Sequence, residues 1–191
     1  MTFRLLLTAL YGCWRLTHWD RKGFGYFQGT PRAFWQSFWA AALGFPAYGA
    51  MLLLDLHNIK TDPIRLVLIE MINYAITWVA FPLVMIWIVD RLGRWPLYYT
   101  YMTIYNWFRV IQMMILAPLN LVIATGLVPM EAGLLLNAAG VTAILLYDWF
   151  IAKESLALDG KSAAAIVVAD MLVSGVVNLA AETLINLPII P

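Results

Sequence analysis

Ionisable and amide side chains recur within the otherwise apolar stretches of this 191-residue chain. Arg109 and Asp170 are the most unusual of them, because each stands in a run of residues that suits lipid. A charged side chain at the centre of a bilayer costs at least about 2.5 kcal/mol, so such residues usually bind ions, relay protons or meet an opposite charge. Since a carboxylate matches the guanidinium fork, we predict an ion pair between Arg109 and Asp170, with Asp148 as the second choice of acid.

Further polar residues follow this pair at helical spacings, and we call the whole set the polar seam. In the stretch 162–185, one helix face carries a polar residue every four positions: Asp170, Ser174, Asn178 and Glu182. In the stretch 97–123, polar residues share a face at steps of three: Asn106, Arg109 and Gln112. Glu70 is expected at about the depth of Glu182. Such a set must face other helices or a wet cavity rather than lipid.

Two interpretations of the polar seam stay open at this point. Facing carboxylates and amides could bind a cation, relay protons or recognise a polar headgroup. The same groups could instead hold helices together through hydrogen bonds worth about 0.6 to 2 kcal/mol each. Glu70 and Glu182 have no evident cationic partner in the sequence, so they are the better candidates for a binding site.

The elements that must position these residues are membrane-spanning helices. The chain is 63% hydrophobic and 12% charged, about half the charged fraction of a soluble domain. Backbone groups in hydrocarbon need partners within their own segment, and the alternation of a barrel strand is absent, so an all-α polytopic bundle is expected. Proline stands at the start of four of the five apolar stretches, where it suits a helix. We predict that residues 30–191 form a bundle of five spans: 33–54, 64–89, 97–123, 130–151 and 162–185.

The segment 1–29 precedes this bundle and has a different pattern. Its polar residues fall on one narrow helical stripe: Arg4, Thr8, Tyr11, Arg15 and His18. The segment is too short and too charged to span a bilayer. It is typical of an amphipathic interfacial helix, with Arg4, Arg15, Trp14 and Trp19 at the lipid headgroups. A helix packed against the cytosolic end of the bundle is compatible with the same pattern.

The lysines and arginines predict the orientation of the bundle. Two of these basic residues, Lys60 and Arg65, lie in a loop on one side of the predicted bundle. Arg109 lies inside a predicted span. The other side carries the remaining nine: Arg4, Arg15, Arg21, Lys22, Arg32, Arg91, Arg94, Lys153 and Lys161. Positive charge stays on the cytoplasmic side of a membrane. We therefore expect a bacterial inner-membrane protein with a cytoplasmic N-terminus and an external C-terminus.

The sequence offers little for catalysis or for a cofactor. The two histidines, His18 and His57, are predicted on opposite sides of the membrane, and Cys13 is the only cysteine. The sequence holds no HExxH, P-loop or dinucleotide fingerprint. A formal net charge of +1 argues against a nucleic-acid partner. We predict a protein that is not an enzyme and has no catalytic residues, no cofactor and no metal.

Two segments carry a resemblance to a known family. They are "VDRLGRWPLYYTYMTIYNW", a basic aromatic turn into the span 97–123, and "KESLALDGKSAAAIVVADML", the approach to the span 162–185. Together with the predicted layout, they resemble the Yip family of Rab-interacting membrane proteins, including its bacterial members. The resemblance implies a non-enzymatic protein that organises the bilayer or its partners. The "DLYGP" signature of eukaryotic members is missing, so a GTPase-binding role and the family's functional residues are not carried over.

The sequence therefore favours a non-enzymatic integral membrane protein that acts as a scaffold, an accessory subunit or a membrane organiser. Its expected partners are membrane lipids, together with other membrane proteins or a second copy of the chain. The alternative is a small ion- or proton-coupled transporter or channel that uses the polar seam. Replacing glutamates of the seam by glutamine would separate the two, because only a transporter needs them for flux.

Overall fold

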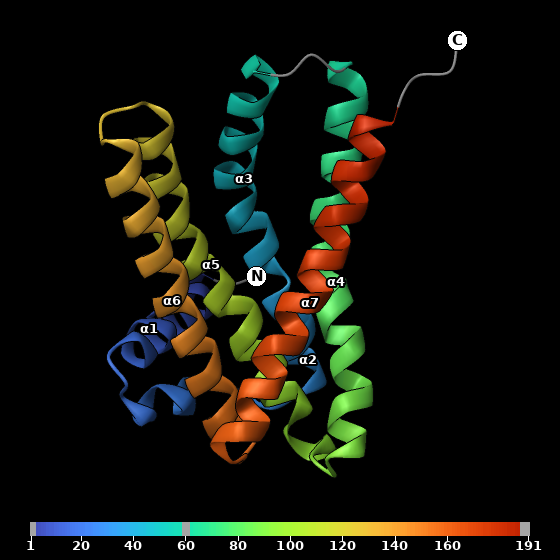
Figure 1. Ribbon diagram of the computed structural model, residues 1–191. Coiled ribbons are helices and arrows are strands. Elements are labelled where there is room, and N and C mark those ends of the chain that lie inside the picture. The colour runs from blue at the N-terminus through green and yellow to red at the C-terminus, as the bar shows by residue number, and fades with distance from the viewer. Residues whose placement is uncertain (1–2, 59–61, 188–191) are drawn as a thin grey trace.

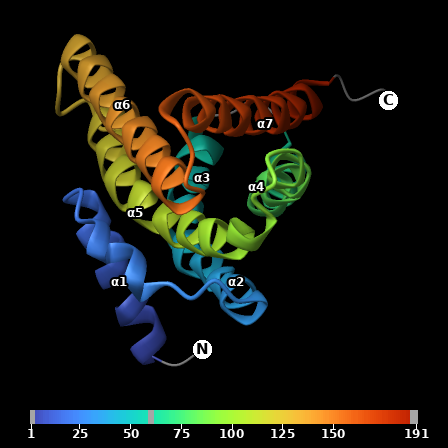
Figure 2. The same ribbon diagram turned by 90° about the horizontal axis from the view of Figure 1, so that it is seen from below.

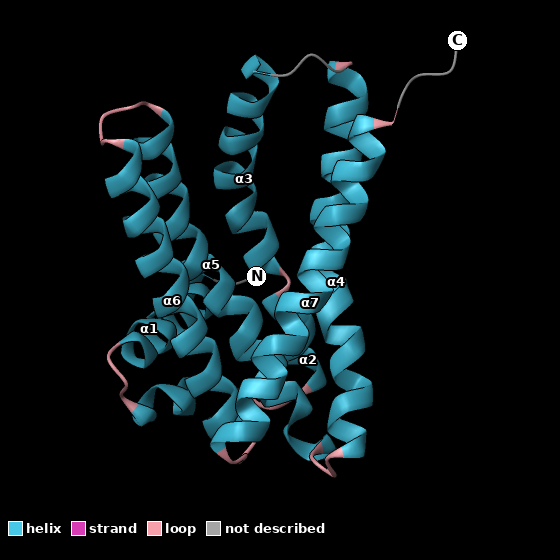
Figure 3. Cartoon of the chain, in the orientation of Figure 1, coloured by secondary structure: helices cyan, strands magenta, loops and turns pink. Residues whose placement is uncertain are grey.

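The computed structural model describes residues 3–58 and 62–187, and these ranges are almost entirely helical (Figure 1; Figure 3). The elements follow in the order α1 (Phe3–Thr17), η1 (Arg21–Tyr26), α2 (Pro31–Ser37), α3 (Trp39–Asn58), α4 (Pro63–Arg91), η2 (Trp95–Leu97), α5 (Tyr98–Ala124), α6 (Met130–Ser155) and α7 (Gly160–Asn186). The expected all-α class is confirmed for the part of the chain that the structure describes.

Within the described residues, four helical segments are long and apolar enough to cross a membrane. They are α4, the η2–α5 unit, α6 and α7, each with 26 to 30 residues. They contain the predicted spans 64–89, 97–123, 130–151 and 162–185 and extend most of them by a few residues. The chain is therefore an integral membrane protein by the length and composition of its helices.

The first predicted span, 33–54, is not one continuous helix. The chain forms the short α2, turns at Phe38 and then forms α3. Asn106 of α5 donates a hydrogen bond of 2.8 Å to the Ser37 hydroxyl, which itself donates to the Phe34 carbonyl oxygen at 2.6 Å. Because these groups are buried, the bonds fix the junction between the two helices. The apolar pattern alone gave no sign of this break.

The helix starts follow from local chemistry. Thr30 caps α2 and Asp62 caps α4, because their side-chain oxygens accept hydrogen bonds of 3.1 Å from the amides of Ala33 and Ile64. Proline occupies the first position of both helices, where its missing N–H has no intrahelical partner to lose. Asp159 caps α7 in the same way. Its hydrogen bond from the Ser162 side chain is the main cause that holds the pKa of Asp159 below its ordinary value.

Helix α5 lies at the centre of the arrangement. It packs against α1, α2, α3, α4 and α6, and α7 closes the bundle by packing against α4 and α6. The segment from Tyr101 to Phe108 is buried at every position, as expected of a helix that contacts neighbours on all sides. In Figure 2, which looks along the bundle, α1 lies outside the group of long helices and beside α5.

Helix α1 packs on the flank of the bundle, beside α5 and α6, and its place relative to a membrane stays a prediction. It runs across the long axis of the other helices (Figure 1). Gly12 allows a close approach, because a Cβ atom there would lie 2.7 Å from the Phe27 ring. Arg15 forms an ion pair with Asp20 and donates to the Tyr26 hydroxyl at 3.2 Å. Its guanidinium therefore ties α1 to η1, a role that the sequence did not reveal.

The basic turns lie at one end of the bundle. The turn between α4 and η2 and the turn between α6 and α7 lie at the same end as the start of α2 (Figure 1). The predicted orientation likewise places these basic turns on one side of the membrane. Lys60, which was predicted on the other side, lies outside the described residues. The assignment of this end to the cytoplasm stays a prediction.

The docking of α1 can be followed through the one cysteine of the chain. Cys13 is fully buried, and burial raises the pKa of its thiol, so little of the reactive thiolate forms near neutral pH. We expect slow labelling by a maleimide in the folded protein. Gly12→Val should speed labelling about tenfold by separating α1 from Phe27, as measured by mass spectrometry of the labelled chain.

Gly25→Val is the matched control for this substitution. Gly25 belongs to η1, and a Cβ atom there would have no neighbour within 4 Å. Labelling of Cys13 should therefore stay slow in this variant. Equal labelling rates for the two valine variants would show that α1 does not depend on the close approach at Gly12.

Candidate functional site

Arg109, in the middle of α5, is held by neutral groups. One Nη atom donates a hydrogen bond of 2.9 Å to the carbonyl oxygen of Thr77 in α4. The guanidinium carbon lies 4.8 Å from the centre of the Trp78 ring and 5.7 Å from that of Tyr105. Both distances are within the range of a cation–π interaction. The half-buried arginine is thus stabilised by a carbonyl dipole and two aromatic faces.

The predicted ion pair between Arg109 and Asp170 is not formed. Asp170 of α7 accepts a hydrogen bond of 2.8 Å from the Tyr105 hydroxyl. The two ion pairs among the described residues are Arg15–Asp20 and Arg21–Glu154. Because Tyr105 precedes Arg109 by four residues, its ring lies beneath the guanidinium while its hydroxyl reaches the carboxylate. Tyrosine therefore separates the two charges that were expected to meet.

Asp148, the second choice for pairing with Arg109, also has a neutral partner. Gln112 of α5 donates through its Nε2 atom to both carboxylate oxygens of Asp148 in α6, at 2.8 and 3.0 Å. The inner part of the polar seam therefore holds a cluster of two acids and one base, each bonded to a neutral group rather than to an opposite charge.

The three polar residues of α5 do not share one neighbour. Asn106 bonds to Ser37 at the end of α2, whereas Arg109 bonds to α4 and Gln112 to α6. Their steps of three residues spread them over a wide arc of the helix rather than a narrow stripe. A helix surrounded by neighbours can use this arc to hold three of them. Ser37, Thr77 and Tyr105 were missed because their partners depend on how the helices are rotated.

The stripe predicted on α7 also divides between two neighbours. Asp170 faces α5, whereas Asn178 accepts a hydrogen bond of 3.3 Å from Asn73 of α4. Ser174 is half-buried between them, and Glu182 is exposed near the end of the helix. The carboxylate of Glu182 therefore does not belong to the buried cluster.

Glu70, which had no evident partner in the sequence, lies in a second cluster. The Tyr48 hydroxyl of α3 donates to its Oε2 atom at 2.5 Å, and Asn73 donates to the same atom at 3.3 Å. Through the Asn73–Asn178 bond, this cluster joins α3, α4 and α7. A carboxylate that accepts two hydrogen bonds in a half-buried position is satisfied without a cation.

One cavity reaches the polar seam from between α3 and α5. It has a volume of about 250 Å³, and its polar lining comes from Tyr48, Arg109, Gln112 and Asn120. Asn120 also accepts a hydrogen bond of 2.7 Å from Asn137 of α6. The one formally charged side chain on this lining is a cation, so the cavity suits a polar or anionic group. Among the described residues, no group of three His, Cys, Asp or Glu could hold a metal ion.

No protein-family model, curated protein or solved structure matches this chain. The function must therefore be argued from the geometry of the helices and of their polar contacts.

Proposed function

We propose that this chain is a non-enzymatic integral membrane protein that works as a scaffold, an accessory subunit or a membrane organiser. In this proposal α3 is the fifth span, because its 20 residues give a length of about 30 Å, which is the thickness of the hydrocarbon core. The N-terminus lies in the cytoplasm of a bacterial cell and the C-terminus outside the inner membrane. The layout is then similar to that of the Yip family.

The bonding of the half-buried charges between the helices carries this proposal. The charged side chains of the inner seam, and Glu70 of the second cluster, are each bonded to a neutral group of a neighbouring helix: Arg109 to Thr77, Asp148 to Gln112, Asp170 to Tyr105 and Glu70 to Tyr48. An ion-transport site needs a carboxylate that can exchange its partners with an ion or with water. Carboxylates held in this way instead fix the packing of the helices.

The outer surface supports contact with lipids and partners. Large aromatic side chains are exposed along α1, in the turn that follows it, on α2 and at the start of α3: Phe3, Tyr11, Trp14, Trp19, Trp35 and Trp39. Tryptophan and tyrosine prefer the boundary between headgroups and hydrocarbon. Since α1 lies across the bundle beside them, we propose that α1, η1 and α2 form a layer at the cytoplasmic headgroups.

The second candidate function is a small transporter or channel. The cavity between α3 and α5 favours it, because the cavity brings Arg109 and Gln112 within reach of a ligand. Its cationic lining would select an anion, whereas the sequence pattern had favoured a cation or proton.

Ion flux in proteoliposomes separates the two candidates. The purified protein should give no proton, potassium or chloride flux above that of protein-free vesicles, and Glu70→Gln/Glu182→Gln should leave this result unchanged. A dye that reports internal pH or membrane potential provides the measurement. A flux that this double variant or Arg109→Gln abolishes would instead establish the transporter. Chemical cross-linking in native membranes, followed by mass spectrometry, then identifies the partners of the scaffold.

A further inference from the structure

Helix α1 is apolar on two of its sides. Its inner side packs on the bundle through buried residues: Ala9, Gly12, Cys13 and Leu16. A second set of large apolar side chains points away from the bundle, since Phe3, Leu7 and Trp14 are 73%, 51% and 54% exposed. These three residues follow one another at steps of four and seven, so they lie on one side of the helix. We call this set the outer ridge. The protein itself therefore covers only part of the apolar surface of α1.

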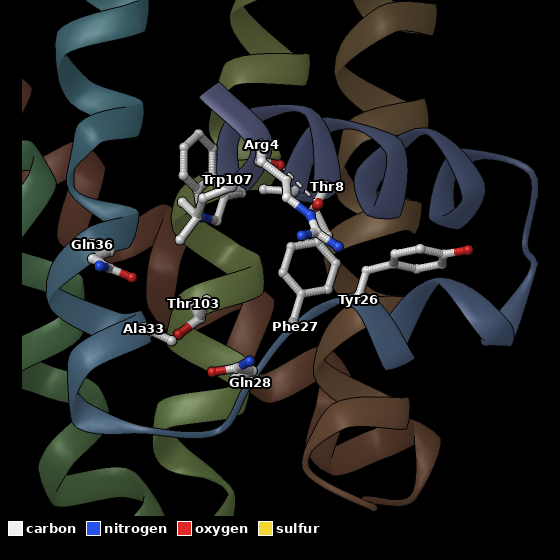
Figure 4. Close-up of a pocket in the computed structure, with 11 residues that line it drawn as sticks. Arg4, Thr8, Tyr26, Phe27, Gln28, Ala33, Gln36, Thr103 and Trp107 are labelled. Carbon is white, nitrogen blue, oxygen red and sulfur yellow. Dashed lines mark hydrogen bonds between the residues drawn. The ribbon is translucent and has the colours of Figure 1, made fainter. Parts of the chain in front are cut away.

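The polar residues of α1 lie on a third side, which faces η1. Arg15 is bonded to the Asp20 carboxylate, which precedes η1, and to the Tyr26 hydroxyl at the end of η1. Figure 4 shows Arg4 on the same side of α1, with its side chain reaching toward Tyr26 and Phe27. It lies there beside a cavity of about 250 Å³ that α1 shares with α2 and α5.

The outer ridge is turned away from η1. A Cβ atom at Gly12 would lie 2.7 Å from the Phe27 ring, and Arg15 bonds to Tyr26, so the centre of the η1 side lies between Gly12 and Arg15. On a helix of about 3.6 residues per turn, the outer ridge then lies about 130° from that centre. Any layer that the outer ridge contacts is therefore different from the layer that contains η1.

Contacts with α6 give the level of α1 and of η1 along the bundle. The Tyr147 hydroxyl of α6 donates to the Thr17 carbonyl oxygen at the end of α1. Glu154 follows seven residues later on α6, next to the basic turn, and pairs with Arg21 of η1. At about 1.5 Å per residue, η1 meets α6 about 10 Å nearer to the basic turn than α1 does. Figure 1 shows this order, with η1 below α1. The polar side of α1 thus faces the basic turns, whereas the outer ridge faces away from them.

We infer that α1 lies in the cytoplasmic leaflet of the membrane, with the outer ridge among the acyl chains and the polar side at the headgroups. An interfacial helix buries its apolar face about 5–10 Å into the boundary between headgroups and acyl chains. The difference of about 10 Å in level between α1 and the Arg21–Glu154 pair agrees with this depth.

Lipid is the occupant that fits the surroundings of the outer ridge. Leu146, which precedes the Tyr147 contact with α1, is 51% exposed and lies in a membrane-spanning helix. The Nζ atom of Lys153 lies 4.9 Å from the centre of the Trp149 ring, and both residue types are common at the headgroups. The outer ridge is therefore at the level where the apolar surface of α6 gives way to its cationic end.

The inference rests on the proposed function and extends it. The proposed function places α1, η1 and α2 together at the cytoplasmic headgroups. The inference assigns one side of α1 to the acyl chains and another side to the headgroups, and so names the part of the lipid that the exposed Phe3 and Leu7 contact.

Electron paramagnetic resonance of the spin-labelled full chain in vesicles of phosphatidylglycerol and phosphatidylcholine tests the inference. Phe3→Cys, Leu7→Cys and Arg4→Cys each receive a nitroxide in a Cys13→Ala background. Oxygen concentrates among acyl chains, whereas a polar nickel chelate stays in water. The ratio of oxygen to chelate collisions should be about tenfold higher at residues 3 and 7 than at residue 4, because Phe3 and Arg4 are neighbours that point to different layers.

Leu172→Cys and Lys22→Cys are the matched references. Leu172 is 65% exposed on α7, and Lys22 is exposed on η1. Labels at residues 3 and 7 should resemble the label at residue 172, and the label at residue 4 should resemble the one at residue 22. If Cys13→Ala does not fold, as judged by circular dichroism, the labels are placed in the native background, where the fully buried Cys13 reacts last.

The outcomes separate the inference from the proposed function. Labels at residues 3 and 7 that meet the chelate as often as the label at residue 22 would overturn the inference. Shielding of these two labels from both reagents would show that protein covers the outer ridge and would overturn it as well. In both cases a label at residue 172 that meets only oxygen leaves the integral membrane protein in place, whereas a label there that meets the chelate removes the proposed function.

Discussion

Replacing Trp107 by alanine is expected to lower the free energy of unfolding by about 3–5 kcal/mol, which is the usual cost of deleting a large buried aromatic side chain. Trp107 is 2% exposed and is the largest of the fully buried side chains. It lies on α5 and lines the same cavity as Leu5 of α1 and Gln36 of α2. Its removal would enlarge the cavity that α5 shares with α1 and α2.

Titration of the protein from detergent micelles with sodium dodecyl sulfate, followed by circular dichroism, measures this loss. Trp35→Ala is the matched control, because Trp35 is 69% exposed and its removal should change the free energy of unfolding by less than about 0.5 kcal/mol. Similar losses for the two variants would mean that α1 and α2 do not depend on Trp107.

The sequence predicted the long helices well because their signals are local. Proline at the first position, a capping Thr or Asp and an apolar run of sufficient length each act within a few residues. The spans 64–89, 97–123, 130–151 and 162–185 therefore agree with α4 to α7. The span 33–54 failed because its break depends on Asn106, which lies about 70 residues further along the chain.

The sequence predicted most of the residues that form the candidate site, but it did not predict which side chains bond to one another. Most of the predicted polar residues do lie between helices, as the cost of facing lipid requires. Their partners could not be predicted, because a partner depends on the rotation of each helix about its axis, and several rotations bury the same residues. One local signal was available. A tyrosine four residues before Arg109 lies on the same helix face and can meet a cation through its ring.

Removing the Tyr105 hydroxyl is expected to lower the free energy of unfolding by about 1–3 kcal/mol, because Tyr105→Phe leaves the half-buried carboxylate of Asp170 without this donor. Replacing both partners, as in Tyr105→Phe/Asp170→Leu, should recover part of this loss, since no polar group is then left unpaired. The same detergent titration gives the free energies. Tyr99→Phe is the matched control: Tyr99 lies one turn and a half earlier on α5, where its hydroxyl makes no hydrogen bond within the described part of the chain.

The double-mutant cycle also decides how Arg109 is held. Hydrogen bonds between membrane helices couple their partners by about 0.6 kcal/mol on average and by 1.7 kcal/mol at most. Because Tyr105 lies between the two charges, the coupling free energy between Tyr105 and Asp170 should exceed the one between Arg109 and Asp170. The second coupling free energy is measured with Arg109→Met. A larger coupling between Arg109 and Asp170 would restore the direct ion pair that the sequence predicted. It would also require α7 to turn about its axis, which would break the bond from Asn73 to Asn178.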